Sequence, residues 1–280
     1  MIKLFAFDID GTLLDNQSKM PETSIEAIKK LDDAGIKVVL ASGRVFFSIQ
    51  HIQKSLGITG PIVSTNGSLI SMDGVKVHKS YYIENELLTS LYEFCLKHKL
   101  EFHFYDEGNY YSNRLNFDRI KHLKLENDYG LNYQVDLIIK NDPVAFLKEQ
   151  KKNALKFQIS AIDKNKISRE KIIDLLVDEF KDELYITGSG DTLIEIGNKN
   201  ATKWSSVEEI CENLGIDNSE VAAIGDAYND IPMVKGAGLG FAMGNAKSQL
   251  KDLADIIVAD NESAGVLEAV NYVLEANRNV

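Results

Sequence analysis

The alternation of short apolar runs with longer amphipathic segments constrains the fold of this chain more than any other feature. Residues 3–7 form an apolar run that stops at Asp8. Residues 21–34 then place apolar side chains at helical spacing, namely Ile25, Ile28 and Leu31. The cycle continues through residues 36–42, 46–56 and 61–67. Buried strands that alternate with helices pair in parallel, so this order predicts an α/β fold with a doubly wound parallel sheet.

The pattern changes near Ser80. Residues 85–97 predict a helix, and the alternating aromatic stretches that follow predict exposed antiparallel strands, at 101–105 and 109–112. Further strands are predicted at 155–161, 184–187 and 192–196, with a charged helix over 168–182. The doubly wound pattern resumes with a helix over 203–214 and an apolar run that ends at Asp226. We therefore expect a core domain of residues 1–83 and 189–280, and an inserted α+β domain of residues 84–188.

Charge and cysteine content narrow the class of protein. The formal net charge of −11 argues against nucleic-acid binding, which requires clustered Lys and Arg side chains. The apolar opening of the chain is too short for a membrane span or a signal peptide. Cys95 and Cys211 fall in helical patterns without metal-like spacing, so we interpret them as ordinary buried thiols. These features predict a cytoplasmic protein with no nucleic-acid or membrane partner.

Asp8 and Asp10 leave the first predicted strand, and Gly11 permits a tight exit from it. Alternate positions can aim two carboxylates at the sheet edge where ligands bind in folds of this type. Taken alone, the pair could equally be a helix cap or a salt-bridge partner.

A second acidic segment, Gly-Asp-Ala-Tyr-Asn-Asp, ends another predicted strand and contains Asp226, Asn229 and Asp230. Converging carboxylates repel one another, and a bound cation is the simplest resolution. Oxygen ligands favour Mg²⁺, whereas Zn²⁺ would require His or Cys, and the five histidines show no ligand-like pairing. The alternative for this segment is an Asx turn before a helix.

Ser42 and Lys203 are candidates for binding an anion. Ser42 and the adjacent amide of Gly43 end a predicted strand and could bind phosphate oxygens, unless Ser42 is simply a helix N-cap. Lys203 begins a helix, where its charge opposes the dipole, and a phosphate or carboxylate partner would offset that effect. Lys199 is a plausible substitute, and a solvated surface lysine is the alternative.

In their order along the chain, the Asp-Ile-Asp-Gly-Thr start, Ser42, Lys203 and the segment around Asp226 resemble the four motifs of the haloacid dehalogenase superfamily. The long insertion, the Val-Ser-Thr-Asn-Gly segment at 63–67 and the distance from Lys203 to Asp226 are similar to the Cof-type sugar-phosphate phosphatases with a type IIB cap. The resemblance implies a Rossmann-like core and a cap that closes over the site and reads the leaving group, with Tyr110, Asn113 and Arg114 as candidate specificity residues. Trp204 departs from the glycine usual after the motif lysine.

The resemblance further implies an Mg²⁺-dependent phosphatase. Asp8 would be the nucleophile that forms an aspartyl-phosphate, and Asp10 the general acid and base. Mg²⁺ would be held by Asp8, the backbone carbonyl of Asp10 and Asp226, with Asp230 acting on it through water. Family dehalogenases lack the second aspartate, so Asp10 argues against carbon–halogen chemistry.

By the same resemblance, Ser42, Gly43 and Lys203 would bind the phosphoryl oxygens. Asn229 and Asp230 would orient the lysine and the metal-bound waters, and Asn66 would lie near the substrate. The substrate would be a sugar phosphate or a similar small phosphomonoester. The chain would act as a monomer or homodimer, between which the sequence does not decide.

Three alternatives differ in activity. A phosphomutase or phosphotransferase on sugar phosphates would share the aspartyl-phosphate but release little inorganic phosphate. A non-enzymatic metabolite-binding protein on the same fold would be expected to lack Asp8 or Asp10. A receiver-type signalling domain would not need an insertion of about a hundred residues.

Overall fold

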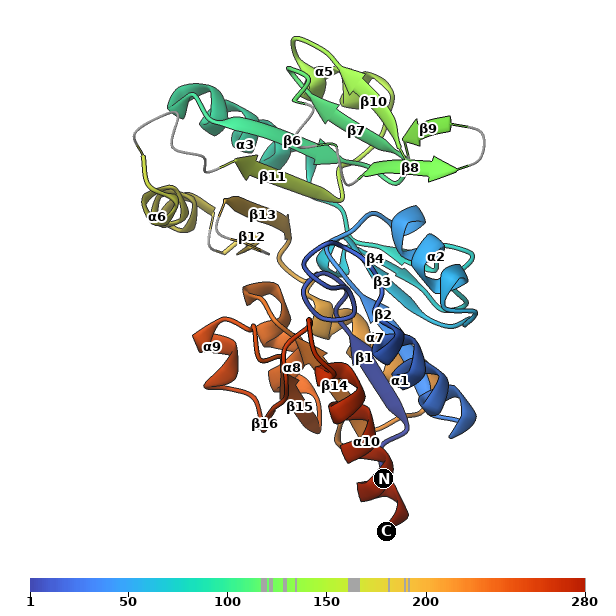
Figure 1. Ribbon diagram of the computed structural model, residues 1–280. Helices are drawn as coiled ribbons and strands as arrows, with labels where there is room; N and C mark the ends of the chain where they lie inside the picture. The colour runs from blue at the N-terminus through green and yellow to red at the C-terminus, as the bar shows by residue number, and fades with distance from the viewer. Residues whose placement is uncertain are drawn as a thin grey trace. The chain divides into compact units, whose positions relative to one another are not determined.

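The computed structural model describes residues 1–279 apart from 117–119, 121–122, 128–129, 134, 161–166, 181, 189 and 191. The chain forms two compact units, Met1–Lys79 with Ala201–Val280, and the inserted Ser80–Asn200 (Figure 1). The insertion is therefore longer than the expected 84–188. The reason is β13 (Leu193–Asn198), which pairs with β11 (Lys156–Ser160) in the sheet of the inserted unit rather than with the core sheet.

The core unit is built on one eight-stranded sheet in the order β16-β15-β14-β1-β2-β3-β4-β5. The strands are β1 (Leu4–Phe7), β2 (Lys37–Ala41), β3 (Ile62–Ser64), β4 (Leu69–Ser71), β5 (Lys79–Ser80), β14 (Val221–Gly225), β15 (Leu239–Ala242) and β16 (Ile256–Ile257). Strand β1 runs parallel to both β2 and β14. Every residue of β1 and β14 is buried, so both faces of the sheet are covered at its centre. The predicted doubly wound α/β core is confirmed.

One edge of this sheet differs from the prediction. Strand β4 is antiparallel to β3, because only the short turn η1 (Thr65–Gly67) connects them. A parallel pair needs a crossover of about a dozen residues, which this turn does not supply.

The helices of the core unit are α1 (Glu22–Asp33), α2 (Phe46–Ser55), α7 (Lys203–Leu214), α8 (Ile231–Gly236), α9 (Ser248–Lys251) and α10 (Gly265–Arg278). Helix α1 packs against α10, and α7 packs against α8. The predicted helix at 203–214 has the bounds of α7, whereas α10 was not predicted.

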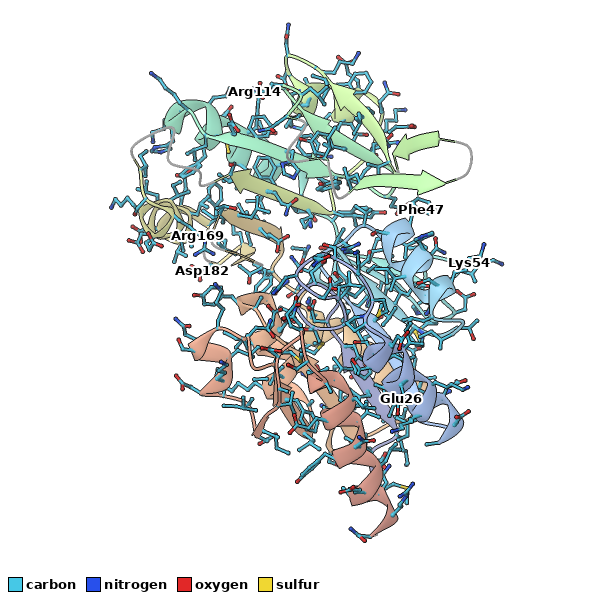
Figure 2. All side chains as sticks on the ribbon, in the orientation of Figure 1. Glu26, Phe47, Lys54, Arg114, Arg169 and Asp182 are labelled. Atoms are coloured by element: carbon cyan, nitrogen blue, oxygen red, sulfur yellow. The ribbon has the colours of Figure 1, made fainter. Side chains whose placement is uncertain are left out.

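Helix α1 shows how the apolar spacing is used. Ile28 and Leu31 are buried as the spacing predicts, but Ile25 is 42% exposed and Ala27 is buried instead. Glu26, labelled in Figure 2, is exposed and pairs with Lys30 one helical turn along α1, at 2.9 Å. The buried stripe of α1 is therefore centred about one position away from the one predicted.

The inserted unit contains a six-stranded sheet in the order β10-β7-β6-β11-β13-β12. Besides β11 and β13, its strands are β6 (Glu101–Tyr105), β7 (Asn109–Ser112), β10 (Asp136–Ile139) and β12 (Leu184–Thr187). Strands β8 (Lys124–Asn127) and β9 (Gly130–Tyr133) form a separate pair. Helices α3 (Asn85–His98), α5 (Pro143–Glu149) and α6 (Arg169–Phe180) lie in the described part of this unit. The predicted α+β character of the insertion is confirmed.

The prediction that β6 and β7 are exposed was wrong. The rings of Phe102 and Phe104 stack on Phe157 in the apolar core of the inserted unit. On the opposite face of the sheet, His103 is also buried, and its Nε2 lies 2.7 Å from Oε1 of Gln158. Alternation of aromatic and polar side chains predicts one solvated face, but here hydrogen bonding allows the polar face to be buried as well.

The two thiols behave as predicted. Cys95 on α3 and Cys211 on α7 are free and buried. Burial raises the pKa of Cys211 to about 11, so this thiol is unreactive at neutral pH. None of the helices in the described part of the chain has the length and apolar character needed to cross a bilayer.

Candidate active site

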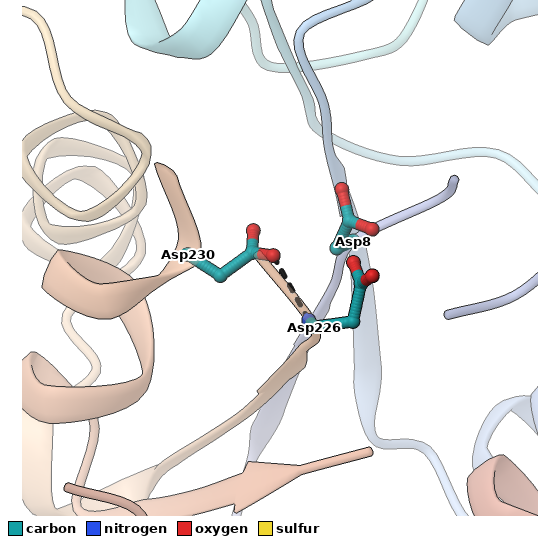
Figure 3. Close-up of side chains that lie close together, drawn as sticks. All are labelled: Asp8, Asp226 and Asp230. Atoms are coloured by element: carbon teal, nitrogen blue, oxygen red, sulfur yellow. Dashed lines mark hydrogen bonds between the residues drawn. The ribbon is translucent and has the colours of Figure 1, made fainter. Parts of the chain in front are cut away.

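The site begins where β1 and β14 end. Phe7 pairs with Ile224 in register, so Asp8 and Asp226 emerge from adjacent parallel strands at the same edge of the sheet. The side chains of Asp8, Asp226 and Asp230 lie close together in Figure 3. One carboxylate oxygen from each lies within 4.8 Å of the others. The two acidic segments of the sequence are therefore brought together at one point.

Lys203 joins this cluster from the first turn of α7. Its Nζ lies 2.6 Å from Oδ1 of Asp8 and 2.5 Å from Oδ1 of Asp230, and the lysine is fully buried. Burial disfavours its charge, but Asp230 and Asp8 outweigh that effect and raise the pKa of Lys203 above its ordinary value. Lys199 instead contacts the backbone carbonyl of Asp182 in the inserted unit, so it does not substitute for Lys203.

Asp230 also shapes the turn that carries Asp226. Its Oδ2 accepts a hydrogen bond from the backbone amide of Asp226 at 3.0 Å (Figure 3). It also accepts one from the backbone amide of Ala227 at 2.9 Å. A Cβ on Gly225 would lie 2.5 Å from Cβ of Asp230, so the strand must end in glycine here. These hydrogen bonds run from the last aspartate of the segment back to its first residues, and they fix the turn that carries Asp226.

Two oxygens of the cluster have no hydrogen-bond partner among the described residues, and both are buried: Oδ2 of Asp8 and Oδ1 of Asp226. Burial, followed by the charge of Asp230, raises the pKa of Asp8 to about 7. Burial, followed by the charge of Asp8, raises the pKa of Asp226 to about 9. Buried carboxylate oxygens without a partner fit a hard divalent cation such as Mg²⁺. Both oxygens of Asp230 already accept hydrogen bonds, one from Lys203 and the other from two backbone amides. Asp230 is therefore suited to positioning these groups rather than to binding a cation directly.

Gly11 is essential to this geometry. Its φ of +83° lies in the left-handed region that favours glycine. A Cβ there would lie 2.5 Å from Oδ2 of Asp226. The exit turn of β1 therefore requires glycine both for its backbone conformation and for the room that Asp226 occupies.

Ser42 follows β2, the other neighbour of β1, and is buried. Its Oγ accepts a hydrogen bond from the backbone amide of Arg44 at 3.2 Å across the turn that contains Gly43. The alternative that Ser42 caps the next helix is wrong, because α2 begins at Phe46 with Val45 as its N-cap. The Ser42 turn thus lies at the same sheet edge as Asp8.

Asn66 and Asn229 meet at this edge as well. The Nδ2 of Asn229 donates to Oδ1 of Asn66 at 3.0 Å, and both side chains are buried. Asn66 adopts a left-handed backbone with φ 61°, and its amide donates to the carbonyl of Ser42 at 3.0 Å. Oδ1 of Asn229 has no hydrogen-bond partner in the described part of the chain. Hydrogen bonds and ion pairs therefore link predicted site residues from five segments of the chain. The segments begin at Asp8, Ser42, Asn66, Lys203 and Asp226.

Two residues of the site were not assigned a role from the sequence. The guanidinium of Arg44 binds both carboxylate oxygens of Asp10, at 2.8 and 2.6 Å, so the salt-bridge alternative holds for Asp10. The hydroxyl of Thr12 is buried without a hydrogen-bond partner among the described residues. For Arg44, the available signal was an arginine directly after Ser-Gly at an acidic sheet edge. For Thr12, the sequence offered no signal.

Trp204 does not alter the start of α7. The helix begins at Lys203 with a capping box between Thr202 and Ser205. The indole packs on Gly236 of α8, where a Cβ would lie 2.3 Å from the ring. The departure from the family pattern is thus accommodated by a second glycine, and Lys203 keeps its contacts.

Three comparisons with known proteins bear on the whole chain. The chain is 28% identical to 5-amino-6-(5-phospho-D-ribitylamino)uracil phosphatase YcsE of Bacillus subtilis, across 97% of this chain and 95% of that protein. It is 29% identical to a phosphoglycolate phosphatase of Methanobrevibacter smithii, across 96% and 97% of the two chains. Its fold is similar to that of a solved subclass IIB sugar phosphatase, with a TM-score of 0.79, 24% identity and coverage of 97% and 98%.

The family model for haloacid dehalogenase-like hydrolases matches residues 5–270, which includes both units and every residue of the site described above. The predicted resemblance to this superfamily is confirmed, and the fold is similar to that of a solved member with a type IIB cap. The chain belongs to the haloacid dehalogenase-like hydrolase family.

Proposed function

We propose that this protein is a phosphatase that uses Mg²⁺ to hydrolyse a sugar phosphate or a similar small phosphomonoester. The observation that carries the proposal is the buried Lys203 between Asp8 and Asp230, next to two carboxylate oxygens without hydrogen-bond partners. A cation and an anionic phosphoryl group would together satisfy these groups. Relatives of similar length that bear the name phosphatase support this assignment.

Asp8 and Asp10 would carry the covalent chemistry. A carboxylate oxygen of Asp8 attacks phosphorus, and the bond from phosphorus to the leaving alcohol breaks as Asp10 gives that alcohol its proton. Water then attacks the aspartyl-phosphate and loses a proton to Asp10, which releases inorganic phosphate and restores Asp8. Two displacements thus replace one slower displacement.

The residues that would hold Mg²⁺ are Asp8, Asp226 and the backbone carbonyl of Asp10, with Asp230 acting through water. When bound, the ion supplies positive charge that reduces repulsion between the carboxylate nucleophile and the phosphate. Asp230 fixes the turn of Asp226 through the two amide hydrogen bonds to its Oδ2.

The phosphoryl oxygens would be held by Ser42, the amide of Gly43 and Lys203. Asp230, which contacts the lysine, and Asn229 would orient it, and Asn66 would lie near the substrate. The hydrogen bond between the two asparagine side chains supports their acting together.

The inserted unit would act as a cap that selects the leaving group. Of the three candidate specificity residues, Tyr110 is buried and its ring stacks on His103, with 4.9 Å between the centroids. Arg114 is exposed and pairs with Glu101 at 3.5 Å, and Asn113 is partly buried. We also propose a cytoplasmic location, with which two free thiols are compatible, and assembly as a monomer or homodimer.

The test is release of inorganic phosphate with and without Mg²⁺ from ribose 5-phosphate, glucose 6-phosphate, glycerol 3-phosphate and p-nitrophenyl phosphate. The wild type should release phosphate only with Mg²⁺, and Asp8→Asn should abolish release. Asp32→Asn, on the exposed face of α1, is the matched control and should keep wild-type rates.

Two results would count against the proposal. Conversion of one sugar phosphate into another with little free phosphate would indicate a phosphomutase. Absence of any turnover by folded wild type would favour a binding protein.

A further inference from the structure

The side chain of Asp10 is held apart from the acidic cluster. Asp8, Asp226 and Asp230 bring their oxygens within 4.8 Å of one another, and the Asp10 carboxylate is not part of that group. Asp10 follows β1 in the exit turn, and its side chain is 52% exposed. A half-exposed carboxylate on a turn needs a specific contact to keep one orientation, because solvated side chains change rotamer rapidly.

Arg44 supplies that contact in a bidentate geometry. Its Nε lies 2.8 Å from Oδ2 of Asp10, and its Nη2 lies 2.6 Å from Oδ1. Two parallel hydrogen bonds between a planar guanidinium and a carboxylate fix the direction of both groups.

Arg44 is itself anchored on three sides. Its Nη1 donates to Oγ of Ser48 on α2 at 3.2 Å. Its backbone amide donates to Oγ of Ser42, and its carbonyl accepts from the amide of Thr65 at 2.9 Å. The guanidinium side chain is only 18% exposed. An arginine that is itself fixed therefore orients the half-exposed carboxylate of Asp10.

We propose that Arg44 is a positioning residue that holds Asp10 in the orientation from which it protonates the leaving alcohol. The inference rests on the proposed function, in which Asp10 is the general acid. Arg44 itself makes no contact with the phosphoryl group in this assignment, so its effect is transmitted entirely through Asp10.

This role predicts a dependence on the leaving group. An alkyl alcohol leaves phosphorus slowly unless it is protonated, whereas p-nitrophenol leaves readily as its anion. Loss of a well-placed general acid must therefore slow alkyl phosphates more than p-nitrophenyl phosphate. An arginine that gripped phosphate, or one that only stabilised the fold, would affect both substrates alike.

The experiment compares kcat/KM, which reports the steps up to the first phosphoryl transfer, for two substrates. One is p-nitrophenyl phosphate. The other is whichever of the three alkyl phosphates tested above the wild type hydrolyses fastest. Arg44→Gln should lower kcat/KM for the alkyl phosphate by ~10-fold or more beyond its loss for p-nitrophenyl phosphate, given the usual size of general-acid contributions. Arg44→Lys keeps the charge but not the bidentate contact, and it should fall between Arg44→Gln and wild type.

Two further variants separate this role from loss of folding. Ser48→Ala removes only the anchor of the guanidinium and should give a smaller loss with the same leaving-group dependence. The double variant Asp10→Asn with Arg44→Gln should be no slower than Asp10→Asn alone. Circular dichroism and thermal unfolding establish that each variant is folded.

Equal losses on the two substrates, or a further loss in the double variant, would overturn the role of Arg44 while leaving the phosphatase assignment intact. Failure of the wild type to release phosphate from any substrate would overturn the proposed function itself.

Discussion

The side-chain nitrogen of Lys203 lies 2.6 Å from a carboxylate oxygen of Asp8, although 195 residues separate them in the chain. The same nitrogen also contacts Asp230, and none of the three side chains is more than 6% exposed. Lys203 is thus the charge that allows two buried carboxylates to face one another.

Replacement of Lys203 by alanine should lower both stability and activity. Removal of one partner from a buried ion pair costs about 3–5 kcal/mol, because the remaining charges are left uncompensated. Urea denaturation should show this loss, and phosphate release should fall by ~10²-fold or more, as for other electrostatic groups at a reacting centre. Lys199→Ala is the control and should change neither quantity. A Lys203→Ala variant with wild-type stability would contradict the ion-pair geometry.

Gly11→Ala should damage the metal site without removing a ligand. A methyl group at Gly11 would lie 2.5 Å from Oδ2 of Asp226 and would displace that carboxylate. Calorimetric titration should show Mg²⁺ affinity lowered ~10-fold or more, in line with the effect of disturbing groups that orient ligands.

Gly35→Ala is the matched control for this change. Gly35 also has a left-handed backbone, with φ +69°, but no atom lies within 4 Å of the added Cβ. Both variants should lose about 1–2 kcal/mol of stability to backbone strain. Only Gly11→Ala should lose Mg²⁺ affinity, and equal affinities in the two variants would contradict the predicted clash.

Gly236→Ala should disturb the packing of Trp204 between α7 and α8. The added methyl would overlap the indole ring and force α7 and α8 apart, at a cost of about 1–3 kcal/mol. Trp204 is the only tryptophan of the chain, so the emission of the folded protein should report its displacement. Gly108→Ala, where no atom lies within 4 Å of the added group, should change stability by less than about 0.5 kcal/mol. Unchanged emission and stability in Gly236→Ala would count against this packing.

The stability of the metal-free protein should fall as pH rises. Asp8 and Asp226 have pKa values of about 7 and about 9, above the ordinary 3.8, so the folded state holds their protons more tightly than the unfolded state does. Their contribution to stability is complete below about pH 4 and is lost as pH rises through both values. The raised pKa of Lys203 changes stability only at higher pH.

Thermal unfolding of metal-free protein between about pH 5 and pH 9 tests this expectation, since the midpoint should decrease over that interval. Mg²⁺ replaces the protons, so the stabilisation by added Mg²⁺ should grow over the same interval. A midpoint that rises with pH in the absence of metal would show that the two carboxylates are not held as described.

Much of the core could be predicted because its signals are local. The run that ends at Asp8 is apolar at every position, as a strand buried on both faces must be. The helix that begins at Lys203 has apolar spacing and a glycine stop at Gly215, so its bounds were predicted correctly. Because both residues follow predicted parallel strands, Asp8 and Asp226 could also be predicted to meet at one edge of the sheet.

Other features depend on partners that are distant in sequence. The pairing of β13 with β11 rather than with the core decides where the insertion ends, and neither strand alone specifies it. The burial of His103 depends on a hydrogen bond to Gln158 in another strand. The contact between Arg44 and Asp10 joins two turns, and no periodicity reports such a pair.

The position of β1 between β2 and β14 has a consequence for biosynthesis. One neighbour of β1 emerges from the ribosome soon after it, but the other begins only at Val221. Until then the nascent chain carries an apolar strand with one unpaired edge, which is a site for aggregation. The inserted unit, with a core of its own, completes its synthesis in that interval. The central pairing of β1 and the acidic cluster at its end therefore both depend on a segment that is synthesised more than two hundred residues later.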